Sequence, residues 1–166
     1  MAQITLKGNP IHTAGDLLPL GSTAPDFVLT NSSLEDVGLD AFAGKCKILS
    51  IVPSLDTGLC AKSAEQFNSV VAGKNDLVLL NISADLPFAA GRFCSSKGLD
   101  NIVTLSSFRS PSFGQDYGVE IIDGPMAGLL SRAVIVLDES NKVLYTEQVP
   151  EIGQEPNYDA ALAALG

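Results

Sequence analysis

The feature that most constrains this chain is a series of short apolar runs that alternate with segments of helical spacing. The run at residues 47–52 is apolar without clean alternation, which is typical of a strand covered on both faces. Further strands are predicted at residues 77–82, 102–105 and 133–137, and helices at 60–72, from 85 to about 94, at 112–117 and at 158–165. Strands that alternate with helices imply βαβ crossovers and a parallel core sheet.

Antiparallel elements are expected outside this core. Residues 4–6 and 11–13 are rich in strand formers and flank a turn that contains Gly8 and Pro10, which predicts an N-terminal hairpin. Residues 27–30 predict a short strand, and residues 143–148 alternate as an antiparallel partner strand. The chain contains no repeat, linker or low-complexity segment. We therefore predict one mixed α/β domain over residues 1–166.

The second predicted helix has signals at both of its ends. Asp85 is a candidate N-terminal cap, and Pro87 falls in the first turn, where proline is tolerated. Gly98 is expected to end the helix, because glycine readily adopts the left-handed backbone of a helix end.

Charge and hydropathy exclude several classes of protein. The chain has ten Lys and Arg residues and nineteen Asp and Glu residues, which gives a net charge of −9. No stretch of the sequence is rich in Lys and Arg. Nucleic acid and anionic membrane surfaces are therefore poor candidates as partners. The apolar runs are too short to span a bilayer, and the N-terminus lacks the pattern of a secretory signal. We expect a soluble, cytoplasmic protein.

Three cysteines (Cys46, Cys60 and Cys94) and one histidine (His12) limit the chemistry. An odd, small number of cysteines in a reducing compartment argues against a structural disulfide framework. No Cys-x-x-Cys pair is present, so neither a zinc knuckle nor a thioredoxin-type dithiol is predicted. A Cys–His dyad or a histidine metal site would have to use His12, which is remote in sequence from every cysteine. We expect no metal and no cofactor, and we interpret Cys46 as a packing residue.

The most informative stretch is residues 53–60 (PSLDTGLC), between a buried strand and a helix. Backbone N–H groups in the first turn of a helix lack intrahelical partners and favour negative charge, so they lower the pKa of a cysteine placed there. Thr57 is one turn before Cys60, and its hydroxyl could donate to a thiolate. Pro53 would fix the loop. Taken singly, Cys60 could be a small core residue, Thr57 a helix cap and Pro53 a strand terminator. Together, the three residues favour a reactive thiol.

These residues form the pattern Pro-x-x-x-Thr-x-x-Cys, which resembles the active-site signature of peroxiredoxins. Residues 21–27 (GSTAPDF) are similar to the entry loop of that family. Residues 53–60 together with residues 82–94 (ISADLPFAAGRFC) resemble its thiol peroxidase branch, the atypical two-cysteine type. Residues 123–125, 132–134 and 155–162 also fit this branch, so the resemblance covers nearly the whole chain.

The resemblance implies a thioredoxin-like α/β three-layer sandwich with a mixed central sheet and an extra N-terminal β-hairpin. It matches Cys60 to the peroxidatic cysteine, Cys94 to the resolving cysteine, and Thr57 and Pro53 to the site threonine and proline. It matches Arg132 to the arginine that stabilises the thiolate. The residues alone do not distinguish Arg132 from Arg92 or Arg109. It implies hydroperoxide as the substrate, thioredoxin as the reductant, a Cys60–Cys94 intrachain disulfide and a homodimer.

Two other functions use the same residues. A redox sensor or relay would take oxidation at Cys60 and pass it to a partner protein with little turnover. A non-catalytic thioredoxin-like binding module would have a damaged site, which the intact set of Pro53, Thr57, Cys60 and Arg132 argues against. A Cys60–Cys94 bridge could also be purely structural, and Cys94 could be a core residue of its helix.

Overall fold

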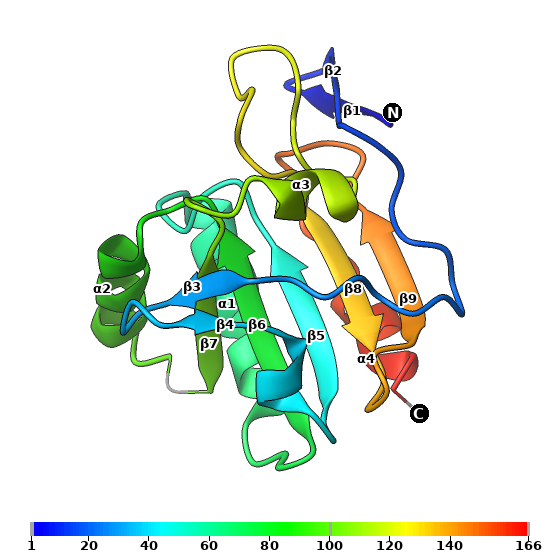
Figure 1. The fold of residues 1–166 in the computed structure, drawn as a ribbon. Helices are drawn as coiled ribbons and strands as arrows, with labels where there is room; N and C mark the ends of the chain where they lie inside the picture. The colour runs from blue at the N-terminus through cyan, green and yellow to red at the C-terminus, as the bar shows by residue number, and fades with distance from the viewer. Residues whose placement is uncertain (1, 100, 166) are drawn as a thin grey trace.

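The chain is built on one seven-stranded sheet and a separate two-stranded hairpin (Figure 1). A computed structural model describes residues 2–99 and 101–165; the side chain of Cys60 lies outside the described part. The sheet order is β4-β3-β7-β6-β5-β8-β9. The strands are β3 (Leu29–Asn31), β4 (Asp36–Val37), β5 (Cys46–Ile51), β6 (Leu77–Ser83), β7 (Ile102–Ser106), β8 (Ala133–Leu137) and β9 (Val143–Gln148).

The sheet is parallel at its centre and antiparallel at its edges. Strand β6 pairs in parallel with β5 and with β7. Strand β8 is antiparallel to β5 and to β9, and β3 is antiparallel to β7 and β4. The predicted parallel core with antiparallel additions is therefore confirmed.

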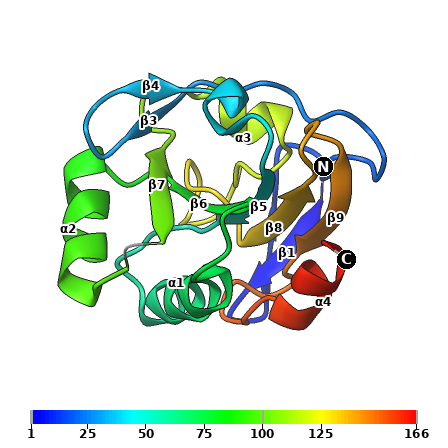
Figure 2. The ribbon, with the colours of Figure 1, turned by 90° about the horizontal axis from the view of Figure 1, so that it is seen from below.

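Helices cover both faces of the sheet (Figure 2). One face carries α1 (Gly58–Val71), α2 (Pro87–Lys97) and α4 (Tyr158–Ala163); the other carries the 3-10 helix η1 (Leu39–Phe42) and α3 (Ser112–Asp116). On β5, Ile48 packs in the cluster that contains Phe67 of α1, whereas Leu49 packs in the cluster that contains Phe113 of α3. Burial on both faces explains why residues 47–52 do not alternate, and the three-layer sandwich is confirmed.

The ends of the helices differ in part from the sequence prediction. Helix α1 begins at Gly58, two residues before the predicted start. Helix α2 continues to Lys97, one turn beyond the predicted end, and stops at Gly98, whose φ of 64° is left-handed. The prediction that Asp85 caps α2 is wrong: Leu86 occupies the cap position and no side chain makes a cap hydrogen bond.

The N-terminal hairpin joins β1 (Gln3–Leu6) to β2 (Asn9–His12) through Lys7 and Gly8, both of which have positive φ. It confirms the predicted hairpin. Two carboxylates attach it to the rest of the chain. Glu151 accepts hydrogen bonds from the Gly8 N–H at 2.9 Å and the Thr5 hydroxyl at 3.1 Å, and Asp123 accepts from the His12 N–H at 2.7 Å.

We expect the attachment of this hairpin to weaken in acid. Backbone hydrogen bonds from Gly153 and Gly8 lower the pKa of Glu151 in the folded protein. A carboxyl whose folded pKa is depressed stabilises the fold above its unfolded pKa, about 4.3 for glutamate, and that contribution is lost as the pH falls through the folded value. The protection factors of the hairpin amides, which are NMR exchange rates corrected for the intrinsic rate at the same pH, should fall below about pH 4 while those of the central sheet persist. In Glu151→Gln this pH dependence should become weaker, and Asp123, whose pKa the His12 side chain lowers, should account for the remainder; an unchanged profile would contradict the assignment.

None of the helices in residues 2–99 and 101–165 combines the length and apolar character that a membrane crossing requires.

Candidate active site

The loop between β5 and α1, residues 52–57, is named the reactive loop because it leads to the predicted reactive thiol of Cys60, and it carries the first predicted site residues. Strand β5 ends at Ile51, the Val52 N–H donates to the Ile82 carbonyl at 3.0 Å, and Pro53 follows as a buried residue. Leu55 is also buried and packs with Val52 and Ala90. The loop therefore leaves the carboxyl edge of the parallel strands with two of its side chains fixed in the core.

Thr57 stands directly before α1. Its carbonyl accepts the N–H of Ala61 at 3.0 Å, which places Thr57 at the N-cap, and its hydroxyl lies 3.5 Å from the Ser54 carbonyl. Gly58 is the first helical residue, so Cys60 is in the first turn of α1. The N–H groups of that turn have no acceptor within the helix, and together with the helix dipole they favour a negative charge there.

Arg132 lies at the same edge of the sheet. It directly precedes β8, and the pairing of Ala133 with Ile51 places its backbone beside the start of the reactive loop. The residue is only 3% exposed, and its Nε donates to the Ile152 carbonyl at 2.9 Å. Arg132 is thus a buried cation, not the exposed charge that a lone arginine before a strand usually is.

A polar cluster that sequence reasoning missed joins α4 to α1. The Tyr158 hydroxyl lies 3.0 Å from the buried Ser63 hydroxyl and donates to Glu155 at 3.1 Å. Burial raises the pKa of Tyr158, and the positive charge of Arg132 is near enough to oppose that rise. The only signal in the sequence was the similarity of residues 155–162 to the thiol peroxidase branch.

The other two cysteines have different surroundings. Cys94 is half-buried on α2 and packs against the cluster shared by α1, α2 and α4. Cys46 begins β5, at the opposite end of this strand from the reactive loop. Burial raises the pKa of the Cys46 thiol, and the charges of Glu139 and Asp76 raise it further. A raised pKa is unlike that of a nucleophilic thiol, and this favours the interpretation of Cys46 as a packing residue.

A hollow of about 660 Å³ opens between the first turn of α1 and one face of α2. Thr57, Gly58 and Ala61 line it from α1 and its cap, and Ala89, Arg92 and Phe93 line it from α2. Its volume falls within the range of small-molecule sites. The hollow gives a ligand access to the threonine and the first turn of α1.

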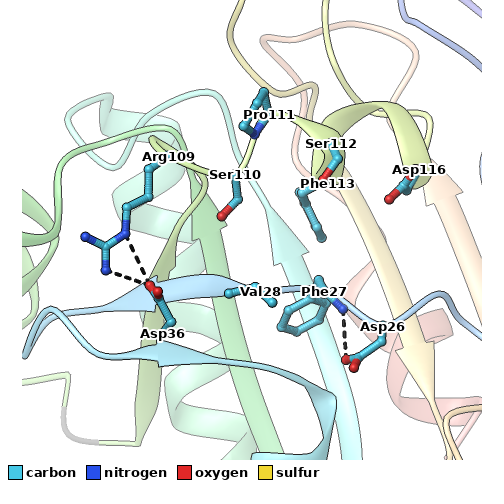
Figure 3. Close-up of a pocket in the computed structure, with 10 residues that line it drawn as sticks. All are labelled: Asp26, Phe27, Val28, Asp36, Arg109, Ser110, Pro111, Ser112, Phe113 and Asp116. Carbon is cyan, nitrogen blue, oxygen red and sulfur yellow. Dashed lines mark hydrogen bonds and ion pairs between the residues drawn. The ribbon is translucent and has the colours of Figure 1, made fainter.

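A second hollow, of about 470 Å³, lies between the chain before β3 and the chain around α3 (Figure 3). Its lining includes Phe27, Phe113 and an ion pair of 2.6 Å between Arg109 and Asp36. Among the predicted site residues whose side chains the structure describes, Pro53, Thr57, Cys94 and Arg132, none lines it. Arg109 is thus engaged away from the reactive loop.

Comparisons with known proteins agree with this geometry. A family model described as Redoxin matches residues 19–162. A curated protein of Mycobacterium tuberculosis named "Thiol peroxidase" is 54% identical over 166 residues, which cover 100% of this chain and 99% of that protein. The chain belongs to the thiol peroxidase branch of the peroxiredoxins. It is a peroxide-reducing, antioxidant enzyme.

Solved structures of this family have the same fold. A peroxiredoxin-like protein from Aquifex aeolicus superposes with a TM-score of 0.92 at 36% identity, covering 99% of this chain and 96% of that one. A thiol peroxidase from Chromobacterium violaceum superposes with a TM-score of 0.91 at 26% identity, covering 98% and 94%. The thioredoxin-like peroxiredoxin fold, with its hairpin, is thereby confirmed.

Proposed function

We propose that residues 1–166 act as one domain that reduces hydrogen peroxide and organic hydroperoxides with electrons from thioredoxin. The observation that carries this proposal is the place of Cys60 in the first turn of α1, at the sheet edge where Pro53 and the buried Arg132 also lie. A thiolate is stabilised by helix N–H groups and by a guanidinium, and the thiolate is the form that attacks a peroxide.

In the first step the Cys60 thiolate attacks the distal oxygen of ROOH. The O–O bond breaks, a sulfur–oxygen bond forms, and the alkoxide leaves and takes a proton to become ROH. Cys60 is oxidised by two electrons to a sulfenic acid. Arg132 and Thr57 hold the O–O axis in line and stabilise the charge that develops on the leaving oxygen, and Pro53 shields the sulfur from water.

In the second step the Cys94 thiol attacks the Cys60 sulfenic acid, forming a disulfide within the chain and releasing water. The two cysteines are carried by separate helices, α1 and α2. A disulfide requires Cα atoms about 4.4–6.8 Å apart, so the first turn of α1 and part of α2 unwind for the sulfurs to meet.

Thioredoxin then reduces the disulfide by thiol–disulfide exchange and leaves oxidised. We place this cycle in the cytoplasm, where thioredoxin keeps thiols reduced, and in a homodimer, following the resemblance of the sequence to its family. No step requires a metal or an organic cofactor.

A coupled assay tests the whole cycle. The protein is mixed with thioredoxin, thioredoxin reductase and NADPH, and cumene hydroperoxide is added while the NADPH absorbance is followed. Rapid loss of NADPH is the expected result. If one equivalent of peroxide oxidises Cys60 but no NADPH is consumed, the protein is a sensor or uses a reductant other than thioredoxin. A Cys60 that is not oxidised at all would overturn the proposal.

The variant Arg132→Lys separates the effect of the guanidinium's geometry from the effect of its positive charge. In Arg132→Lys the positive charge remains, but the planar fork of donors is lost. We expect kcat/KM for cumene hydroperoxide to fall about 100- to 1000-fold, the usual loss when one oriented donor to a developing charge is removed. Arg109→Lys is the matched control, because that arginine pairs with the exposed Asp36 in the second hollow. Equal rates in wild type and Arg132→Lys would remove Arg132 from the mechanism.

A further inference from the structure

Asp85 makes a set of contacts that have no part in the proposed reaction steps. It follows β6 by two residues, and its carboxylate reaches across to the reactive loop. One oxygen accepts from the Ser54 hydroxyl at 2.8 Å, and the other accepts from the Leu55 N–H at 2.7 Å and from the Ser83 hydroxyl at 2.9 Å. A side chain that the sequence suggested as a helix cap therefore binds the loop that leads to Cys60.

Asp85 is itself held by two neighbouring strands. The Ser83 hydroxyl at the end of β6 bonds both its carboxylate and, at 3.3 Å, its N–H. The Ser106 hydroxyl at the end of β7 donates to its carbonyl. Ser83 and Ser106 are 2% and 1% exposed. The carboxylate is thus a rigid extension of the sheet.

From Asp85 the contacts continue to the helix cap. The Ser54 hydroxyl that donates to Asp85 also accepts the N–H of Asp56 at 3.1 Å, and the Ser54 carbonyl lies 3.5 Å from the Thr57 hydroxyl. Thr57 in turn is the N-cap of α1. Hydrogen bonds to a carboxylate are about twice as strong as those between neutral groups, so this path fixes the loop more firmly than the serines could alone.

We propose that Asp85 is a positioning residue for peroxide reduction, which holds the loop at residues 54–57 so that the first turn of α1 presents its N–H groups to the Cys60 thiolate. It acts through Ser54 and Leu55 and does not touch the reacting atoms. This inference rests on the proposed role of Cys60.

The rate of Cys60 sulfenic acid formation, measured in a single turnover over a range of pH, tests this inference. In Asp85→Ala we expect a rate at least about tenfold lower, because misplacement of a reacting group by about 1 Å can lower a rate about a hundredfold. The pH midpoint of the rate should rise, because the N–H groups of the first turn of α1 no longer hold fixed positions from which to stabilise a thiolate. Asp85→Asn keeps an oxygen acceptor for the loop and should recover most of the rate.

Asp138→Ala is the matched control. Asp138 also accepts two backbone N–H groups, from Ser140 at 2.8 Å and Lys142 at 2.9 Å, in the β8–β9 turn at the far end of the sheet. Its loss should lower the free energy of unfolding in urea and leave the rate and the pH midpoint unchanged. An equal loss of rate in Asp138→Ala, or a wild-type rate and pH midpoint in folded Asp85→Ala, would overturn the inference.

Ser54→Ala keeps the inference testable if Asp85→Ala does not fold, because it removes one hydrogen bond to the carboxylate. It should slow oxidation severalfold, and a wild-type rate would also count against the role of Asp85. A wild-type protein whose Cys60 does not react would instead mean that the proposed function has failed. If the wild type reacts and the variants keep its rate and pH midpoint, only the positioning role of Asp85 is contradicted.

Discussion

Replacing Cys60 by serine is expected to abolish peroxidase activity, with a fall in kcat/KM of at least about 10³-fold. The first turn of α1 can shift a thiol to its thiolate near neutral pH, because the ordinary pKa of cysteine is about 8.5. A serine hydroxyl in the same turn stays protonated at that pH, and its oxygen is a poor nucleophile toward a peroxide. The coupled assay with cumene hydroperoxide measures the loss directly.

Cys46→Ser is the control for this variant. It also replaces one thiol by a hydroxyl, but at the opposite end of β5 from the reactive loop and at a thiol whose pKa burial raises. It should retain the wild-type rate. Activity that persists in Cys60→Ser, or that disappears in Cys46→Ser, would move the chemistry to a different cysteine.

The arrangement of strands was readable from the sequence because burial leaves a strong pattern. Residues 47–52 lie between two helical layers, so nearly every side chain in the run had to be apolar or internally paired. Lys47 shows the second case: it is 0% exposed, and its Nζ donates to Asn141 at 2.6 Å. The two-residue strand β4 gave no comparable pattern, because it lies at an edge of the sheet and its Asp36 is exposed.

The start of α2 shows why a local signal can mislead. An aspartate ahead of a helix can cap it or bind elsewhere, and the choice depends on which donors the fold brings near. Here the Leu55 N–H and the Ser54 hydroxyl come from a loop about 30 residues away, and they take both oxygens of Asp85. Proximity of this kind arises from the pairing of β5 with β6, which local sequence does not encode.

The three arginines make the same point about the site. The sequence alone offered Arg92, Arg109 and Arg132 without a reason to choose among them. The fold separates them: Arg132 is buried at the edge where the reactive loop begins, Arg109 pairs with Asp36, and Arg92 lines the hollow along α2. Only the resemblance to peroxiredoxins selected Arg132 in advance.

Replacing Cys94 by serine should separate the two halves of the cycle. The peroxide step uses groups at the N-terminus of α1, whereas Cys94 lies near the end of α2, where its carbonyl accepts the N–H groups of Gly98 and Leu99. Cys94→Ser should therefore reduce about one equivalent of hydroperoxide per chain at the wild-type rate. Turnover with thioredoxin should then stop, because no intrachain thiol is left to attack the sulfenic acid and form the disulfide that thioredoxin reduces.

The measurement is a burst experiment, in which the alcohol product is counted against protein concentration with and without thioredoxin, thioredoxin reductase and NADPH. Cys46→Ser again serves as the control and should turn over continuously. The expected difference is large, since one product per chain replaces indefinite cycling. Continuous turnover of Cys94→Ser would mean that thioredoxin attacks the Cys60 sulfenic acid directly, or that another thiol resolves it. In either case α2 would not need to unwind, and its left-handed stop at Gly98 could remain intact throughout catalysis.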